Sequence, residues 1–167
     1  ALGKNGKLVY DVGLENLMEQ EYKWFWVDFD CPDKEESLML RSIFGFHPLA
    51  IEDCLMRLQR PKLDYYDDHV FFVFHALNQK TYAKEEVTAF LSDRFIVTFH
   101  LQHSDEINEV WKRLRFAGEQ QNWQPGLVLY HLLDKIVDNY FPPLYQIEDL
   151  LNELDENSNM ETTESLL

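Results

Sequence analysis

The feature of this sequence that most restricts its fold is a regular apolar repeat that follows Pro125-Gly126. Its members alternate spacings of three and four residues and are Tyr130, Leu133, Val137, Tyr140, Leu144, Ile147, Leu151 and Leu154. Such a repeat predicts a long helix with an apolar seam that packs against another helix. Pro142-Pro143 interrupts it, which predicts a kink or a restart with Pro143 in the first turn. We expect the partner helix to lie outside this sequence or in a neighbouring subunit.

Five short stretches rich in β-branched and aromatic residues lie upstream and predict strands. They are residues 8–12, 24–30, 69–76, 87–91 and 95–100. The stretch 69–76 is apolar on both faces apart from its histidines, so we expect it at the centre of a sheet. The turn Ser92-Asp93-Arg94 predicts a hairpin between the last two strands.

Three further helices are predicted from the residues at their boundaries. One covers 35–44 and ends at a glycine, and the next begins with Pro48, since proline at the first helical position loses no hydrogen bond. Arg60-Pro61 is expected to end that helix, because the residue before a proline favours extended backbone. The third follows Ser104, an N-cap residue, and continues to Gly118. The chain is therefore expected to mix α and β structure.

The charge of the chain restricts its partners. Thirty acidic residues against fifteen Lys and Arg give a formal net charge of −15. This charge opposes nucleic-acid phosphates and anionic lipids, so no nucleic-acid partner is expected. The surplus carboxylates suit divalent cations, or serve solubility alone. No apolar run approaches the ~20 residues of a membrane-spanning helix, and the N-terminus lacks a secretory apolar segment, so this part of the chain is expected in the cytosol.

One pair of adjacent acids, Glu52 and Asp53, lies in the second turn of the helix that begins at Pro48. Neighbouring helical residues point about 100° apart, so the two carboxylates cannot share one direction. One of them can pair with Arg57 or Lys62 while the other faces solvent or a metal ion. From the residues alone, a solvated acidic surface is favoured over a metal site.

Other acids lie further along the chain. Asp134 and Asp138 are four residues apart on the predicted long helix, where like charges repel, so a counter-charge is expected from an arginine or a divalent cation. A second group precedes the strand at 69–76 and consists of Asp64, Asp67 and Asp68. It lacks the glycine turn and the ligand spacing of a calcium-binding loop, so a solvated turn is favoured.

The cysteines and histidines give a weaker signal. Cys31 and Cys54 are isolated in the sequence and are expected to be reduced, buried thiols. The histidines considered as zinc ligands are His47, His69, His75, His100 and His103. His100 and His103 have a usable spacing, but no cysteine accompanies them, so structural roles are favoured over a zinc site.

Motifs of common enzymes are missing, including G-x-S-x-G, GxxxxGK[ST], GxGxxG and HExxH, so an enzyme is not expected. The sequence instead contains an ordered series of blocks. They read FGFHPLAIEDCL, QRPK, YYDDHVFFVFHAL, LSDRFIVTFH and LVLYHLLDKIVDNYF. With these blocks in this order, most of the chain resembles the CorA magnesium-transporter family.

The resemblance implies an α/β (α+β) fold, a three-layer α/β/α sandwich with a mixed sheet, followed by a long C-terminal helix. The α/β/α domain is expected over 1–124 and a long helix, kinked near Pro142-Pro143 and packing toward a stalk, over 125–156. A frayed polar tail is expected over 157–167. The resemblance also implies a homopentamer whose stalk leads to two membrane helices, and we expect the stalk and those helices to lie beyond this sequence.

The resemblance also implies that Mg²⁺ is a regulatory ligand held by acids at the protomer interface. Glu52 and Asp53 stand where the family has its HP…ED acids, and Asp134 matches an aspartate before the Asp-Tyr-Phe pattern. The family's partner acid lies on the stalk of the adjacent subunit, so these sites are expected to be incomplete in this chain. The expected function is a cytoplasmic Mg²⁺-sensing domain of a cell-membrane divalent-cation transporter. The alternatives are the same domain of a zinc-transporting relative, or a separate acidic module that binds a partner helix through the seam.

Overall fold

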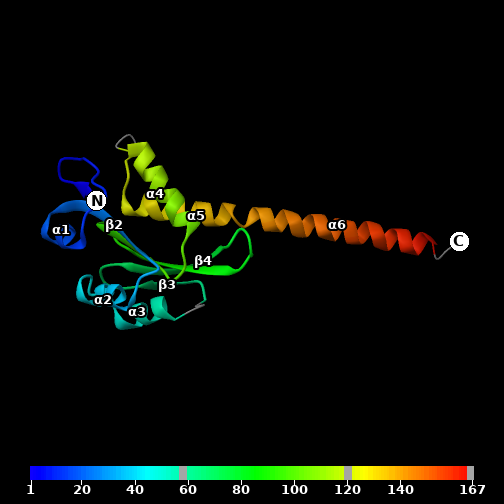
Figure 1. Cartoon of the computed structure of the whole chain (residues 1–167), viewed down its shortest axis with the longest axis horizontal. Helices are drawn as coiled ribbons and strands as arrows, with labels where there is room; N and C mark the ends of the chain where they lie inside the picture. Colours follow the sequence, from blue (N-terminus) through cyan, green and yellow to red (C-terminus); the bar gives the residue numbers. More distant parts are fainter. Residues whose placement is uncertain (57–59, 119–121, 165–167) are drawn as a thin grey trace.

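The computed structural model describes residues 1–56, 60–118 and 122–164, with side chains described as far as residue 157 (Figure 1). Within these residues a six-stranded mixed sheet has the strand order β1-β2-β6-β5-β4-β3. The strands are β1 (Leu2–Gly3), β2 (Tyr22–Asp30), β3 (Lys62–Tyr65), β4 (Val70–Leu77), β5 (Lys84–Leu91) and β6 (Phe95–His100). The helices are α1 (Leu14–Glu19), α2 (Lys34–Ser42), α3 (Pro48–Leu55), α4 (Asp105–Ala117), α5 (Pro125–Asp138) and α6 (Phe141–Glu164). β2 and β6 are parallel, and the other neighbouring strands are antiparallel.

Helices cover both faces of the sheet and form the outer layers of the domain (Figure 1). α4 and α5 lie on one face, over a core that includes Trp26 and Leu132. α2 and α3 lie on the other face, over a core rich in phenylalanine that includes Phe46 and Phe90. The predicted three-layer α/β/α sandwich, its mixed sheet and the long C-terminal helix are therefore confirmed.

The middle strands are buried on both faces, which explains their nearly continuous apolar sequences. On β6, Ile96 and Val97 are both fully buried and contribute to opposite cores, as successive strand residues must. The strands predicted at 24–30, 87–91 and 95–100 are confirmed as β2, β5 and β6. The last two form the predicted antiparallel hairpin.

Two strand predictions need correction. No strand forms over 8–12, where Leu8 makes only an isolated bridge with Leu2. The two-residue strand β1 takes the place beside β2, and Asp11 adopts a φ of +52°, which a strand does not allow. The stretch 69–76 is a strand, but β4 lies next to the edge strand β3 and not at the centre. Its two apolar faces arise because both cores extend as far as β4.

The helix boundaries follow local chemistry where a cap or a proline is present. Pro48 occupies the first turn of α3, and Gly118 ends α4 with a φ of +53°. Ser104 Oγ caps α4 by accepting a hydrogen bond from the Ile107 amide at 3.3 Å. α3 ends earlier than predicted, because Met56 is already extended before Arg60-Pro61 is reached.

The Ser104 cap gives a direct stability prediction. Ser104→Ala should lower the free energy of unfolding by about 1–2 kcal/mol, because the Ile107 amide loses its acceptor and the buried Glu106 carboxylate loses a donor. Urea unfolding followed by circular dichroism measures the change. Ser42→Ala, at an exposed position near the end of α2, should have little effect. Equal losses in the two variants would contradict a capping role for Ser104.

α5 carries two apolar faces. One contains Val128, Leu132 and Ile136 and is buried against the sheet. The other begins the predicted seam, whose most exposed members are Tyr130, Val137, Leu144, Ile147, Leu151 and Leu154. Each of these six side chains is between 53% and 65% exposed. No described residue of the chain covers this face of α6, so the seam has no partner helix within the described structure.

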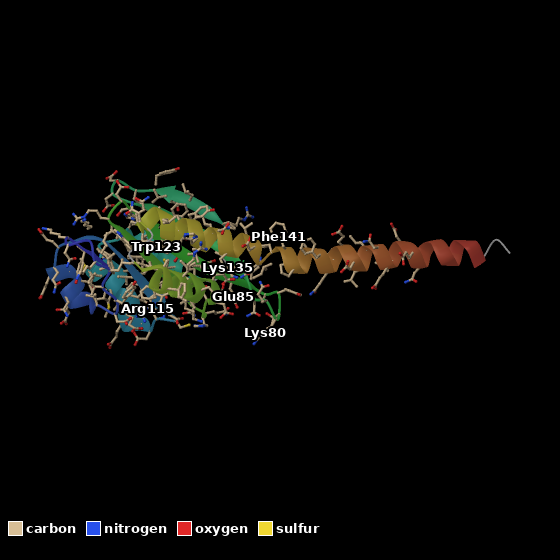
Figure 2. The ribbon with its side chains drawn as sticks, turned by 90° about the horizontal axis from the view of Figure 1, so that it is seen from above. Lys80, Glu85, Arg115, Trp123, Lys135 and Phe141 are labelled. Carbon is tan, nitrogen blue, oxygen red and sulfur yellow. The ribbon has the colours of Figure 1, made fainter. Side chains whose placement is uncertain are left out.

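The junction between α5 and α6 lies at Asn139-Tyr140, and hydrogen bonds hold it to the domain. Asn139 Nδ2 donates to Glu106 Oε1 at 2.7 Å, and Gln79 Nε2 donates to the Asn139 carbonyl at 3.1 Å. The Tyr140 hydroxyl donates to the His75 carbonyl at 2.9 Å. α6 then leaves the domain and continues to Glu164 (Figure 2).

Candidate functional site

The first candidate acids lie on α3, which begins with Pro48 in its first turn. Ala50 and Cys54 are four residues apart and are both buried against the sheet. Because they define the inner side of this short helix, Glu52 is turned outward and exposed, whereas Asp53 is half-buried. The two acids therefore occupy different environments, as their adjacency on a helix requires.

A lysine on β3 holds Asp53. Lys62 Nζ lies 2.6 Å from Asp53 Oδ2 and 2.9 Å from Asp64 Oδ2, so one ammonium bridges two carboxylates. The hydrogen bond to Asp53, followed by that to Asp64, raises the pKa of Lys62 above its ordinary value and keeps it charged. Glu52 has no ion pair among the residues that the structure describes. The other predicted partner, Arg57, lies outside the described residues.

Asp134 lies on α5 and is exposed. The next residue, Lys135, forms an ion pair with Glu109 on α4 at 2.7 Å, and Asp134 has no ion-pair partner within the described ranges. α5 and α3 pack on opposite faces of the sheet, so the sheet separates Asp134 from Glu52 and Asp53 (Figure 1). A single ion that binds all three predicted acids would therefore need a second chain.

His131, one turn before Asp134, should make stability sensitive to acid. It is only 6% exposed and lies between the rings of Trp123 and Tyr130. Burial, and then the charge of Arg113, lowers the pKa of His131 below 6.5 against the opposing effect of Asp134. The unfolded chain therefore binds this proton first, and the free energy of unfolding falls as pH drops below about 6.5.

Replacing His131 by glutamine should remove that part of the acid sensitivity. As the pH falls from 7 to 5, His131→Gln should lose less free energy of unfolding than the wild type, because glutamine takes up no proton. Urea unfolding at the two pH values measures it. A difference that does not change with pH would show that His131 has the same pKa in the folded and unfolded chains.

A second group of metal-binding side chains was not predicted. Asp30, Cys31 and His100 each offer one ligand atom, and these atoms lie within 4.8 Å of one another. The expectation that no cysteine accompanies the histidines is therefore wrong for His100, and Cys31 is exposed and not buried. Cys31 and His100 are far apart along the chain, and the parallel pairing of β2 with β6 sets Asp30 opposite His100.

A sequence profile of a protein family, described as CorA-like Mg²⁺ transporter protein, matches residues 21–167. The chain belongs to this family. The CorA-like chain is 42% identical over 167 residues to the putative metal ion transporter YfjQ of Bacillus subtilis. It is 34% identical over 123 residues, 69% of its length, to the cobalt/magnesium transport protein CorA of Thermotoga maritima. The predicted family is thereby confirmed, and it is a family of transporters and not of enzymes.

Solved structures share the fold of this CorA-like chain. The CorA magnesium transporter of Methanocaldococcus jannaschii matches with a TM-score of 0.65 and 19% identity, over 89% of this chain and 46% of that chain. The cytoplasmic domain of ZntB from Vibrio parahaemolyticus matches with a TM-score of 0.67 and 16% identity, over 79% of this chain and 55% of that chain. At these identities the matches demonstrate a common fold alone.

The CorA-like chain covers only part of its relatives. The matched region includes the whole of this chain but only 52% of the Bacillus subtilis protein. The match to the Thermotoga maritima protein covers 34% of that protein. In the described ranges, no helix combines the length and the apolar character that crossing a bilayer requires.

Proposed function

We propose that this chain is the Mg²⁺-sensing regulatory domain of a pentameric CorA-like divalent-cation transporter, on the cytoplasmic side of the cell membrane. Glu52, Asp53 and Asp134 supply carboxylates at the interfaces between protomers, where acids from outside this sequence complete the sites. Mg²⁺ bound there holds neighbouring protomers together and favours the closed transporter. Loss of Mg²⁺ shifts the population toward the open state and increases uptake.

The observation that best supports this proposal is the separation of the acids on opposite faces of one sheet. Glu52 and Asp134 are exposed and have no ion pair in the described structure, so both are accessible to a neighbouring chain. Mg²⁺ takes oxygen ligands and keeps several of its waters, so a few carboxylates shared between two chains suffice for a weak site. Weak binding suits a sensor that must release its ion.

The ion pair between Lys62 and Asp53 gives the proposal a second support. When no Mg²⁺ is bound, the ammonium neutralises Asp53 at 2.6 Å and prevents repulsion with Asp64. Mg²⁺ therefore competes with a lysine already in place. This competition weakens the site and stabilises the Mg²⁺-free state, as a reversible switch requires.

The exposed seam of α5 and α6 fits the same proposal. It packs against a helix of the transporter stalk that lies outside this sequence, or against a helix of an adjacent protomer. The seam residues from Leu144 to Leu154 are each more than half exposed and recur at the spacing of helix packing. In this arrangement acids of the domain over 1–124 and Asp134 of the helical segment over 125–156 bind Mg²⁺, and the helical segment transmits the change toward the membrane.

The test uses the full-length transporter that contains this chain. Trypsin digestion with and without Mg²⁺ measures how strongly the ion protects the closed assembly. Asp53→Ala should raise the Mg²⁺ concentration needed for half-protection by about tenfold or more, because a carboxylate ligand is lost. Asp67→Ala, at an exposed acid outside the proposed site, should leave it unchanged. Equal protection of wild type and Asp53→Ala would refute the proposed role of Asp53.

Lys62→Met provides a test in the opposite direction. It removes the ammonium that competes for Asp53 and leaves Asp53 and Asp64 to repel each other without the ion. The variant should therefore need less Mg²⁺ for half-protection than wild type. A requirement for more Mg²⁺ would show that Lys62 supports the site and does not compete with the ion.

Which ion crosses the membrane is a separate question, and the zinc-transporting alternative shares this fold. Metal-stimulated flux through the full-length protein in vesicles, measured with Mg²⁺ and Zn²⁺ in turn, distinguishes the two. The proposal expects Mg²⁺ flux that internal Mg²⁺ inhibits. Zinc flux without Mg²⁺ flux would favour the alternative. A full-length protein without membrane helices would favour the separate interaction module.

A further inference from the structure

The group formed by Asp30, Cys31 and His100, together with nearby His103, lies where β2 and β6 end. The two strands are parallel, and their register sets Asp30 directly opposite His100. Their carboxyl ends therefore meet at one edge of the sheet, and the residues that follow them share the same space. Cys31 follows β2 with a φ of +51°, a conformation that few residues other than glycine adopt.

The distances from Asp30 to its neighbours in this group are close to those between ligands of one metal ion. Asp30 Oδ1 lies 3.3 Å from Cys31 Sγ and 3.6 Å from His100 Nδ1, and Asp30 Oδ2 lies 3.2 Å from His103 Nδ1. Ligand atoms of a tetrahedral zinc site lie about 3.3–3.8 Å apart, because bonds of about 2.0–2.3 Å meet at the tetrahedral angle. Asp30, Cys31 and His100 therefore already lie close to the spacing of a coordinated set, whereas His103 contacts the other Asp30 oxygen and must move to become the fourth ligand.

The environment of His100 is a separate observation that points to a metal ion. Its side chain is 1% exposed, and its Nε2 lies 3.2 Å from both carboxylate oxygens of Asp28. Asp28 in turn accepts a hydrogen bond from Thr98 Oγ1. In zinc sites, a histidine that binds the metal through one ring nitrogen usually donates a hydrogen bond from the other nitrogen to a carboxylate that is itself hydrogen-bonded. Nδ1 lies 2.6 Å from the Gln102 carbonyl and 3.6 Å from Asp30 Oδ1.

We propose that Asp30, Cys31 and His100, with His103 as the fourth ligand, bind a borderline-soft divalent cation of the Zn²⁺ class. A set with thiolate and imidazole ligands selects zinc or cobalt over Mg²⁺, which prefers oxygen alone. The site is therefore chemically distinct from the acids proposed above to sense Mg²⁺, and it gives the domain a binding site for a second kind of metal.

Binding requires only local changes. His100 Nδ1 is 2.6 Å from the Gln102 carbonyl, so metal binding exchanges this hydrogen bond for a metal bond and releases the Nδ1 proton to water. The Cys31 thiol likewise releases its proton. Cys31 is exposed, and the side chains of Asp30 and His103 are 45% and 59% exposed, so the ion can enter from solvent.

The experiment titrates Co²⁺ into the reduced chain without oxygen and records the absorption spectrum. One Co²⁺ per chain should give a thiolate-to-cobalt charge-transfer band and the strong visible bands of tetrahedral cobalt. Equimolar Zn²⁺ should remove them, whereas a large excess of Mg²⁺ should not. Displacement by Mg²⁺, or no charge-transfer band in the wild type, would overturn the proposal and leave His100 as a structural partner of Asp28.

Two variants at exposed positions test which side chains bind the ion. Cys31→Ser should lose the charge-transfer band, and its Zn²⁺ affinity should fall more than about tenfold. His103→Asn should keep that band but lose tetrahedral intensity and affinity. Cys54→Ala, at the buried cysteine, should retain the full spectrum. An unchanged band in Cys31→Ser would overturn the proposal, and unfolding curves confirm that each variant is folded. None of these outcomes depends on Mg²⁺ sensing, so the two proposals can fail separately.

Discussion

Replacing Phe90 by alanine should lower the free energy of unfolding by about 3–5 kcal/mol. Phe90 lies on β5 and is fully buried. Its ring is parallel to that of Phe46 with 3.8 Å between centroids, and the ring of Phe71 lies 4.8 Å away. Alanine would leave a cavity among aromatic rings that belong to the sheet and to the segment between α2 and α3, so these elements cannot easily collapse into it.

Urea unfolding of the chain measures this loss. The slope of the free energy of unfolding against urea concentration should stay the same in the variant. Tyr65→Ala is the control, because it removes a large aromatic side chain that is 80% exposed. Its effect should stay within about 0.5 kcal/mol. A small loss for Phe90→Ala would mean that the phenylalanine core rearranges to fill the space.

Asn139→Ala should cost about 1–3 kcal/mol, because it leaves a buried carboxylate short of a hydrogen bond. Glu106 is only 2% exposed and receives hydrogen bonds from Asn139 Nδ2 at 2.7 Å and from Ser104 Oγ at 3.2 Å. Alanine removes the shorter of the two, which is also one of the three hydrogen bonds that hold the junction before α6.

A double-mutant cycle with Glu106→Gln separates these two effects. If Asn139 mainly stabilises the Glu106 charge, Asn139→Ala should cost less when position 106 carries a neutral amide. Asn152→Ala, on the exposed part of α6, should cost little. Additive losses in the cycle would show that Asn139 acts through its other contacts and not through Glu106.

The parts of the fold that local chemistry determines could be predicted from the sequence. Ser104 and Pro48 mark helix starts because the first turn of a helix has unpaired backbone N–H groups. Ser104 supplies an acceptor for one of them, and Pro48 has no N–H to pair. The doubly buried strands could be recognised because helices on both faces demand apolar residues at every position. These signals need no knowledge of distant residues.

The predictions that failed depend on partners elsewhere in the chain. Residues 8–12 have the composition of a strand, but a strand forms only beside a neighbour, and Leu2–Gly3 pairs with β2 instead. Cys31 and His100 are far apart in the sequence, and only the parallel register of β2 and β6 brings them together. Likewise, the helices that carry Glu52 and Asp134 could be predicted, but not that they occupy opposite faces of the sheet.

α6 is attached to the domain near its N-terminal end, so a small rotation at that end moves its C-terminal end over a larger distance. Beyond the junction, its described contact with the domain is the bond from the Tyr82 hydroxyl to Gln146 Oε1 at 2.8 Å. Its 24 residues extend about 36 Å at ~1.5 Å per residue. A rotation of roughly 10° at Asn139-Tyr140 therefore displaces the far end by about 6 Å. Sub-ångström shifts of the few hydrogen bonds at the base become side-chain-sized movements at the tip.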